Sequence, residues 1–293
     1  MESLRNEKQR EVLMGFFKTG EGEYGEGDEF LGLKVPQTRE VVKMALNESK
    51  EPLTMNPEPL RLCREYRLHL SNSSELDCIR FARYLTIDEV PELLMSKWHE
   101  VRLCGLLILV AKFEKLATKK LVKDEYAIRG RDEILTMYLQ YAEQANNWDL
   151  VDLSVHKILG HWLLLPSRID GSKNLWNHGS TDFDDRTCKI KVLDELAQSD
   201  NLWKQRMSMV CTWKTSQMGD PSWCLRYAEI HLHHPHDLMH KAVGWMLREM
   251  GKRVSMDLLR EFLRQHANEM PRTMLRYAIE KMPETERKEW MKR

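Results

Sequence analysis

The chain has 293 residues, of which 42% are hydrophobic and 31% are charged, and its formal net charge is zero. A chain of this length buries roughly three quarters of its unfolded surface, and the balanced charge excludes the class of strongly basic tail proteins. Because residues 201–293 hold 17 Lys and Arg against 11 Asp and Glu, we expect this third of the chain to meet an anion.

The six cysteines form no C-x-x-C pair, which is typical of reduced, buried cysteines in a cytosolic protein. The first ten residues lack the apolar run of a signal peptide. The longest apolar run, Leu103–Ala111, is about half of a membrane span. We therefore expect a soluble, cytoplasmic protein that does not associate with a membrane.

The N-terminal residues predict two helices separated by a loop. The first helix spans residues 5–18, and residues 19–28 follow as an acidic, glycine-rich loop. No G-x-G-x-x-G follows a strand here, so we exclude a nucleotide-binding fingerprint. Residues 30–33 re-enter the core, and the second helix covers residues 35–47. The buried stripe expected on the first helix consists of Val12, Leu13, Phe16 and Phe17.

Apolar residues at helical spacing predict paired helices along most of the remaining chain. Residues 165–188 contain Pro166, Gly171 and Gly179 with few periodic apolar residues, so they are predicted to be a loop insertion. Successive helices of this length favour an all-α fold, a HEAT-like helical-repeat solenoid forming one domain over residues 1–293, with a concave binding face. The predicted helices lie near residues 58–69, 74–85, 88–97, 98–113, 125–144, 148–164, 188–198, 202–216, 221–233, 237–251, 254–268, 271–282 and 283–292.

The predicted helix that begins near Asn147 carries an indole and a carboxylate on one face. Trp148 and Asp152 are four residues apart, so they are neighbours on a helix surface. Leu150 and Val151 point elsewhere and supply the core, so neither Trp148 nor Asp152 is needed there. The alternative is a packed Trp148 beside a solvated Asp152, which is what an isolated W-x-x-x-D spacing usually means.

Two later helices combine an indole with a cation. Trp203 and Arg206 are three residues apart, and Lys241, Trp245 and Arg248 share one stripe. A guanidinium suits either a carboxylate or a phosphate. Taken alone, each helix fits better with a packed indole and an ion-paired or solvated arginine. Together, the three helices would form a surface suited to a ligand that is anionic at its edge and cationic at its centre.

The sequence resembles the HEAT-like-repeat DNA glycosylases of the AlkD type, a group of DNA alkylation repair enzymes. The resemblance runs from residue 30 to residue 280 and is densest in N-W-D-L-V-D at 147–152 and K-A-V-G-W-M-L-R-E at 241–249. It implies a catalytic carboxylate, two aromatic partners and two phosphate-holding arginines. These roles fall on Asp152, on Trp148 and Trp245, and on Arg206 and Arg248. Outer DNA contacts are expected from Lys241, Arg272 and Tyr24.

The expected reaction is hydrolysis of the N-glycosidic bond of 3-methyladenine or 7-methylguanine in double-stranded DNA. A purine alkylated at N3 or N7 is already cationic, so it departs without a general acid. Asp152 would stabilise the developing positive charge on the sugar and orient a water molecule. The two indoles would share that charge through their π faces. We expect a monomer that needs no cofactor.

Two other interpretations remain open. His236 and His240 are four residues apart beside Asp237, which resembles a metal site, but Pro235 and Asp237 are already explained as a helix start, and we expect no metal. The alternative from a different class is a non-catalytic HEAT-type module that binds DNA or protein. Asp152 discriminates between the two classes, because a carboxylate facing phosphates weakens plain DNA binding.

Overall fold

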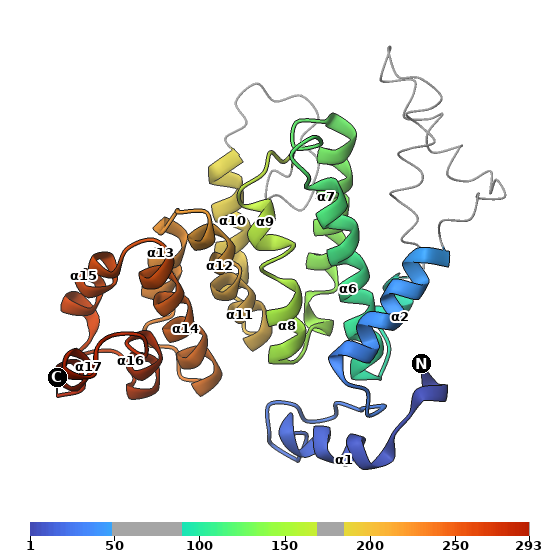
Figure 1. Cartoon of the computed structure of the whole chain (residues 1–293), viewed down its shortest axis with the longest axis horizontal. Helices are drawn as coiled ribbons and strands as arrows, with labels where there is room; N and C mark the ends of the chain where they lie inside the picture. Colours follow the sequence, from blue (N-terminus) through green and yellow to red (C-terminus); the bar gives the residue numbers. More distant parts are fainter. Residues whose placement is uncertain (49–89, 169–184, 293) are drawn as a thin grey trace. The chain divides into compact units, whose positions relative to one another are not determined.

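The computed structural model describes residues 1–48, 90–168 and 185–292. Within these ranges the regular elements are all helical, apart from an isolated bridge between Glu29 and Trp98, which confirms the all-α class (Figure 1). The chain divides into two compact units, Met1–Asn147 and Trp148–Arg293. The single-domain organisation stays a prediction. The helices predicted near residues 58–69 and 74–85, and residues 169–184 of the predicted insertion, lie outside the described residues.

The N-terminal unit is built around α6, which packs against α2, α5 and α7. Helix α6 is buried on nearly every side, as its apolar sequence predicts. Asp124 caps α7 by accepting a hydrogen bond of 2.9 Å from the backbone N–H of Ala127, because the first turn of a helix leaves its N–H groups without partners. The described elements of this unit are η1 (Glu2–Leu4), α1 (Glu7–Phe16), α2 (Val35–Glu48), α5 (Val90–Leu94), α6 (His99–Leu116), α7 (Glu125–Gln140) and η2 (Ala142–Gln144).

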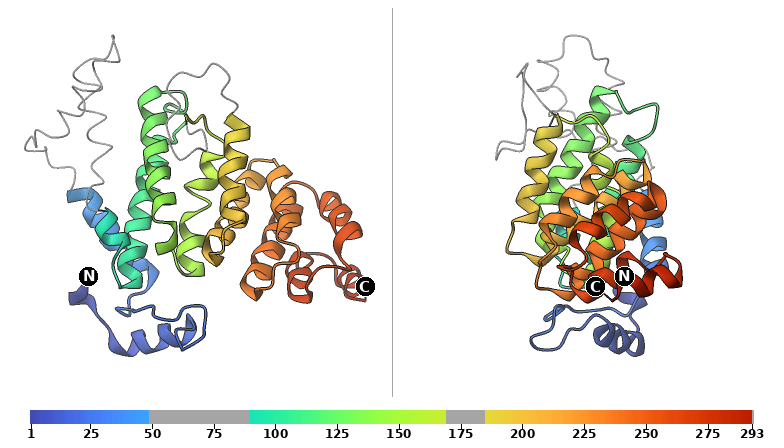
Figure 2. Two further views of the ribbon diagram at one scale, coloured as in Figure 1. Left: turned by 180° about the vertical axis from the view of Figure 1, so that it is seen from behind. Right: turned by 90° about the vertical axis from the view of Figure 1, so that its left-hand side faces the viewer.

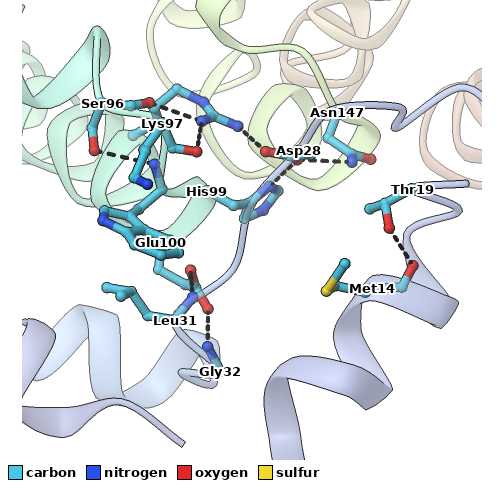
Figure 3. A network of polar contacts seen from close by, with 12 residues as sticks. Met14, Thr19, Asp28, Leu31, Gly32, Ser96, Lys97, His99, Glu100 and Asn147 are labelled. Atoms are coloured by element: carbon cyan, nitrogen blue, oxygen red, sulfur yellow. Dashed lines mark hydrogen bonds and ion pairs between the residues drawn. The ribbon is translucent and has the colours of Figure 1, made fainter. Parts of the chain in front are cut away.

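A buried carboxylate at the start of α6 holds the segment before α2 (Figure 3). Glu100 accepts hydrogen bonds of 2.8, 2.8 and 2.9 Å from the backbone N–H groups of Leu31, Gly32 and Leu33. Gly32 has a φ of +85°, and a Cβ there would lie 2.1 Å from the carbonyl oxygen of Asn6. The position therefore requires glycine, and the expectation that residues 30–33 enter the core is confirmed.

The buried stripe predicted for α1 is only partly correct. Phe17 is buried and packs on Phe30, with ring centroids 5.2 Å apart, and Leu13 is half-buried. Val12 and Phe16, however, are 59% and 60% exposed. Helix α1 has no fully buried residue, because it contacts the core mainly through Phe17, the residue after its last turn.

Helix α14 is the centre of the C-terminal unit, where it packs against α11, α12, α13, α15 and α16 (Figure 1, Figure 2). Helix α10 begins three residues before its predicted start. The described elements of this unit are α8 (Trp148–Ser154), α9 (Leu159–Trp162), α10 (Asp185–Ala197), α11 (Leu202–Val210), α12 (Thr212–Gln217), α13 (Ser222–Ile230), α14 (Asp237–Arg253), α15 (Met256–His266), α16 (Arg272–Ala278) and α17 (Glu284–Trp290).

Two segments predicted as single helices, 148–164 and 202–216, are each interrupted. The first breaks between α8 and α9, where the N–H of Gly160 donates to the carbonyl of Val155, five residues back, over 2.9 Å. The second breaks at Cys211, between α11 and α12. The interruptions face each other, because a Cβ on Gly160 would lie 2.4 Å from the carbonyl oxygen of Cys211.

The ends of the predicted 165–188 insertion are held together by a buried lysine. Lys189 donates hydrogen bonds of 2.7 Å to the carbonyl of Leu165 and 2.6 Å to the carboxylate of Asp185. Its ammonium group also lies 5.5 Å from the ring centre of Trp162. The four cysteines in the described ranges are free and buried, as expected. No helix in these ranges is long and apolar enough to cross a membrane.

Candidate functional site

An ion pair joins α8 to α11 in the C-terminal unit. The Nε and Nη2 atoms of Arg206 donate to the two carboxylate oxygens of Asp152 over 2.9 and 2.8 Å. Its Nη1 atom donates to the carbonyl of Leu238 in α14 over 2.7 Å. One guanidinium therefore connects three helices, and three of its five N–H groups have acceptors in the protein.

Asp152 remains partly accessible, whereas Arg206 does not. The side chain of Asp152 is 14% exposed and that of Arg206 is 5% exposed. Burial raises the pKa of Asp152 above its usual value, and the charge and hydrogen bonds of Arg206 offset part of that rise. Both oxygens accept hydrogen bonds from a group that stays protonated, which is the geometry of an ionised carboxylate. Each oxygen keeps one further lone pair that can accept a hydrogen bond from water.

The indoles predicted beside these charged groups have different environments. Trp148 is half-buried and begins α8, one turn before Asp152, so the two residues share a helix face. Trp203 is buried and belongs to the core. The aromatic roles that the resemblance implies for Trp148 and Trp245 stay a prediction.

The predicted stripe on α14 lies in line with Leu238, whose carbonyl accepts the hydrogen bond from Arg206. Leu238, Lys241, Trp245 and Arg248 follow one another at helical spacing. Trp245 is half-buried, and Lys241 forms an ion pair of 2.7 Å with Asp237. The helical spacing thus places three predicted site residues in one row of α14.

Gly244 lies beside this row and lets α16 approach α14 closely. A Cβ at Gly244 would lie 2.4 Å from the carbonyl oxygen of Met274 and 2.5 Å from the Cβ of Tyr277. The group that comes close to this glycine is therefore the backbone of α16.

Arg248 is also paired with carboxylates. It donates through Nη1 to Glu280, which follows α16, and through Nη2 to Glu249 over 3.3 Å. Glu249 in turn accepts a hydrogen bond of 3.1 Å from Arg253. Glu280 and Glu249 were not among the residues predicted from the sequence.

The structure adds a row of side chains that links Asp152 to this charged cluster. His156 lies one turn after Asp152, and its Nδ1 donates to the Asp152 carbonyl over 2.9 Å, since a carbonyl oxygen only accepts. The His156 ring meets the Trp213 ring edge-on at 5.1 Å, and the Arg253 guanidinium lies 4.8 Å from the centre of the Trp213 ring. The spacing of four from Asp152 was a signal for His156, but no sequence signal marked Trp213.

The two remaining predicted DNA contacts lie elsewhere in the chain. Arg272 is exposed at the start of α16 and donates to the carbonyl of Met291. Tyr24 is half-buried in the glycine-rich loop of the N-terminal unit. Its expected approach to DNA stays a prediction.

A buried polar network fixes the end of the loop that contains Tyr24 (Figure 3). Asp28 accepts hydrogen bonds from His99 over 2.7 Å, from Asn147 over 3.4 Å and from Arg102. Burial alone would raise the pKa of Asp28, but the hydrogen bonds and charges of His99 and Arg102 outweigh it and hold that pKa below its usual value. Asn147 directly precedes Trp148 in the sequence, so the network also fixes the residue before α8.

The histidine-rich segment before α14 is held together by hydrogen bonds. His231 is buried against Ser208 at 2.8 Å, His234 lies 2.8 Å from Gln205, and His236 caps α14 by accepting from the N–H of Leu238 over 3.1 Å. No group of three or more potential metal ligands occurs among the described residues.

Comparisons with known proteins match the chain to a family and to a similar solved structure. A sequence model of the DNA alkylation repair enzyme family matches residues 1–188 and 174–282. The chain is also similar to a solved structure, a "predicted DNA alkylation repair enzyme" from Enterococcus faecalis, with a TM-score of 0.58 and 12% sequence identity. The similarity covers 96% of this chain and 97% of the other, and at this identity it supports the fold alone. No curated protein matches the chain.

Proposed function

Because the chain belongs to the DNA alkylation repair enzyme family, we propose that it is a DNA glycosylase for cationic alkylated purines. Its substrates would be lesions such as 3-methyladenine and 7-methylguanine in double-stranded DNA, and its reaction would be hydrolysis of the N-glycosidic bond. The observation that carries this proposal is the Asp152 carboxylate, which Arg206 holds by both oxygens while the side chain stays 14% exposed.

A fixed carboxylate suits the chemistry of a labile lesion. The positive charge of an alkylated purine makes it a good leaving group, so the enzyme need not supply a proton. The sugar becomes positively charged as the bond breaks, and a preorganised negative group stabilises that charge. The second lone pair on an Asp152 oxygen would orient the attacking water.

Arg206 acts in this mechanism as a positioning residue for Asp152. Three of its N–H groups are taken by Asp152 and Leu238, and its side chain is almost inaccessible. The role of phosphate contact then falls mainly on the more accessible cations Arg248, Lys241 and Arg272. Trp148 and Trp245, both half-buried, would pack against the deoxyribose and stabilise its charge through their π faces.

Lesion selectivity in this mechanism would come from the lability of the damaged base. The proposed contacts involve the sugar and the phosphates, which position a nucleic acid but carry no base sequence. The protein would act as a monomer in the cytoplasm without a cofactor.

The test is release of methylated purines from alkylated duplex DNA by the wild-type protein and by Asp152→Asn. We expect Asp152→Asn to lower the excision rate by at least about 100-fold, because it removes the negative charge beside the sugar. Binding of DNA that contains an abasic site should persist. Both quantities are measured by chromatography of the released bases and by fluorescence anisotropy.

A matched control is Asp194→Asn. Asp194 also pairs with an arginine, Arg226, at 2.8 Å and accepts a hydrogen bond of 2.8 Å from Tyr227. Neither partner belongs to the proposed site, so excision should stay near the wild-type rate. Full excision by Asp152→Asn would remove Asp152 from the mechanism. Duplex binding by the wild-type protein without any base release would favour the non-catalytic binding module.

A further inference from the structure

The cations proposed to contact DNA from α14 are already engaged by carboxylates. Lys241 pairs with Asp237 at 2.7 Å, and Arg248 pairs with both Glu280 and Glu249. A DNA phosphate that approaches either cation must therefore compete with an acidic side chain for the same N–H donors. The carboxylate that loses this competition is the one that solvent can accept most easily.

The two partners of Arg248 differ in accessibility. Glu249 is 10% exposed and is held on its other side by Arg253 at 3.1 Å. Glu280 is 42% exposed and lies beyond the end of α16, where its other cationic partner is Lys281 at 2.9 Å. Exposed ion pairs contribute little to stability, so Glu280 can leave Arg248 at small cost, whereas Glu249 remains in place.

The packing of α16 on α14 brings Glu280 to Arg248. Gly244 lies one turn before Arg248 and has no Cβ. The carbonyl of Met274 can therefore approach α14 at this position, where a Cβ would lie only 2.4 Å from its oxygen. The hydrogen bond with Lys281, and then the charge and hydrogen bond of Arg248, lower the pKa of Glu280. In the free protein Arg248 is therefore paired with an ionised carboxylate. Its two oxygens resemble the pair of oxygens that a DNA phosphate would present to the same guanidinium.

We propose that Glu280 competes with a DNA phosphate for Arg248 and thereby limits how tightly the protein holds undamaged DNA. In the free protein Glu280 keeps the guanidinium of Arg248 paired. On binding, a backbone phosphate replaces Glu280, which returns to solvent and to Lys281. Non-specific affinity for DNA comes almost entirely from such phosphate contacts, so this competition lowers affinity for every duplex. The inference rests on the proposed function, because it needs Arg248 to face DNA.

The test is duplex binding by Glu280→Gln, which keeps the size of the side chain and removes its charge. The probes are an undamaged fluorescent duplex and the same duplex with an abasic site, titrated at several salt concentrations. We expect Glu280→Gln to bind the undamaged duplex roughly 3- to 10-fold more tightly. Its plot of log affinity against log salt should be steeper by up to about 0.9, because one phosphate contact no longer exchanges with a carboxylate.

Glu261→Gln is the matched control. Glu261 lies on α15, is 54% exposed and pairs with Arg264, so this variant makes the same change in net charge at an arginine outside the proposed site. Its affinity should change by less than about 2-fold, as expected for a rim charge. The double variant Glu280→Gln with Arg248→Met identifies the released cation, because it should lose the gain and bind like Arg248→Met alone.

Each other outcome overturns a defined statement. If Glu280→Gln and Glu261→Gln both bind the duplexes with the affinity of the wild type, the inference is overturned and the proposed function is unaffected. If the double variant Glu280→Gln with Arg248→Met keeps the gain in duplex affinity, the effect arises from Lys281 and the inference is also overturned. A wild-type protein that binds neither duplex would overturn the proposed function and the inference together. If Glu280→Gln folds poorly by circular dichroism, Glu280→Asp shortens the same side chain and should give a smaller gain.

Discussion

Arg206 and Asp152 show how one residue can restrict the role of another. An exposed arginine is free to grip a phosphate, but Arg206 is 5% exposed and bonded to both oxygens of Asp152. Removing one member of a buried pair leaves the other charge without compensation, which costs far more than the pair contributes. The value of this pair to the protein is therefore the fixed orientation of the carboxylate.

We expect Arg206→Met to lower the free energy of unfolding by about 3–5 kcal/mol, because it leaves Asp152 buried without a partner. The double variant Arg206→Met with Asp152→Asn should recover part of this loss, since it removes the orphaned charge as well. Urea unfolding of the wild type, both single variants and the double variant measures the coupling. Strictly additive losses would show that the two side chains do not depend on each other.

Helical spacing indicated which residues of the candidate site share a helix face, but not which distant side chains they contact. A spacing of four placed Trp148 and Asp152 on one face, and the same rule aligned Lys241, Trp245 and Arg248. The bond between Asp152 and Arg206 spans 54 residues of sequence, so it depends on how α8 meets α11, and helical periodicity carries no information on that. Glu280 was missed for the same reason.

At the level of helices, the two interruptions in the C-terminal unit form a matched contact. Gly160 has no side chain, and this lets the first turn of α9 touch the backbone at Cys211, where α11 gives way to α12. The pair thus forms one joint between the α8–α9 segment and the α11–α12 segment.

Gly160→Ala tests this joint. A methyl group at Gly160 would lie 2.4 Å from the carbonyl oxygen of Cys211, so the two segments must separate, and we expect a loss of about 1–3 kcal/mol in the free energy of unfolding. Gly15→Ala is the control, because its methyl group would have no neighbour within 4 Å. It should raise stability by up to about 1 kcal/mol through helix propensity. Equal effects of the two substitutions would contradict the proposed joint.

Most described helices lie where the sequence predicted them, because caps and apolar periodicity are local signals. The exceptions are tertiary in origin. The breaks at Gly160 and Cys211 follow from contact between distant segments, and the exposure of Val12 and Phe16 follows from the way α1 meets the core through Phe17. An amphipathic pattern indicates which face is apolar, and the surrounding fold determines whether that face is covered.

For the whole molecule, Glu133 and His231 contribute in opposite directions to the response of stability to pH. Burial raises the pKa of Glu133 in the N-terminal unit to about 7. Burial, together with the nearby charge of His234, lowers the pKa of His231 in the C-terminal unit to about 4. Between about pH 4.5 and 6.5 the folded chain holds an extra proton at Glu133 and lacks one at His231, relative to the unfolded chain. Their contributions to the pH dependence of stability therefore oppose each other.

We expect the variants Glu133→Gln and His231→Gln to change this pH dependence in opposite directions. Without Glu133, acidification from about pH 6.5 to about pH 4.5 should lower stability more than in the wild type, because His231 remains to be protonated on unfolding. Without His231, the same acidification should raise stability relative to the wild-type trend, because Glu133 takes up its proton in the folded state. Urea unfolding at both pH values checks this, and variant slopes equal to the wild-type slope would exclude these two groups.

Gly244 shows how an uncharged position can govern an electrostatic contact. Any larger residue there would meet the Met274 carbonyl and Tyr277 and would push α16 away from α14, moving Glu280 away from Arg248. Natural variants at residue 244 would then resemble variants that remove a charge. They would bind undamaged DNA more tightly, although no charge has changed. A survey of sequence variation restricted to acidic and basic positions would overlook them.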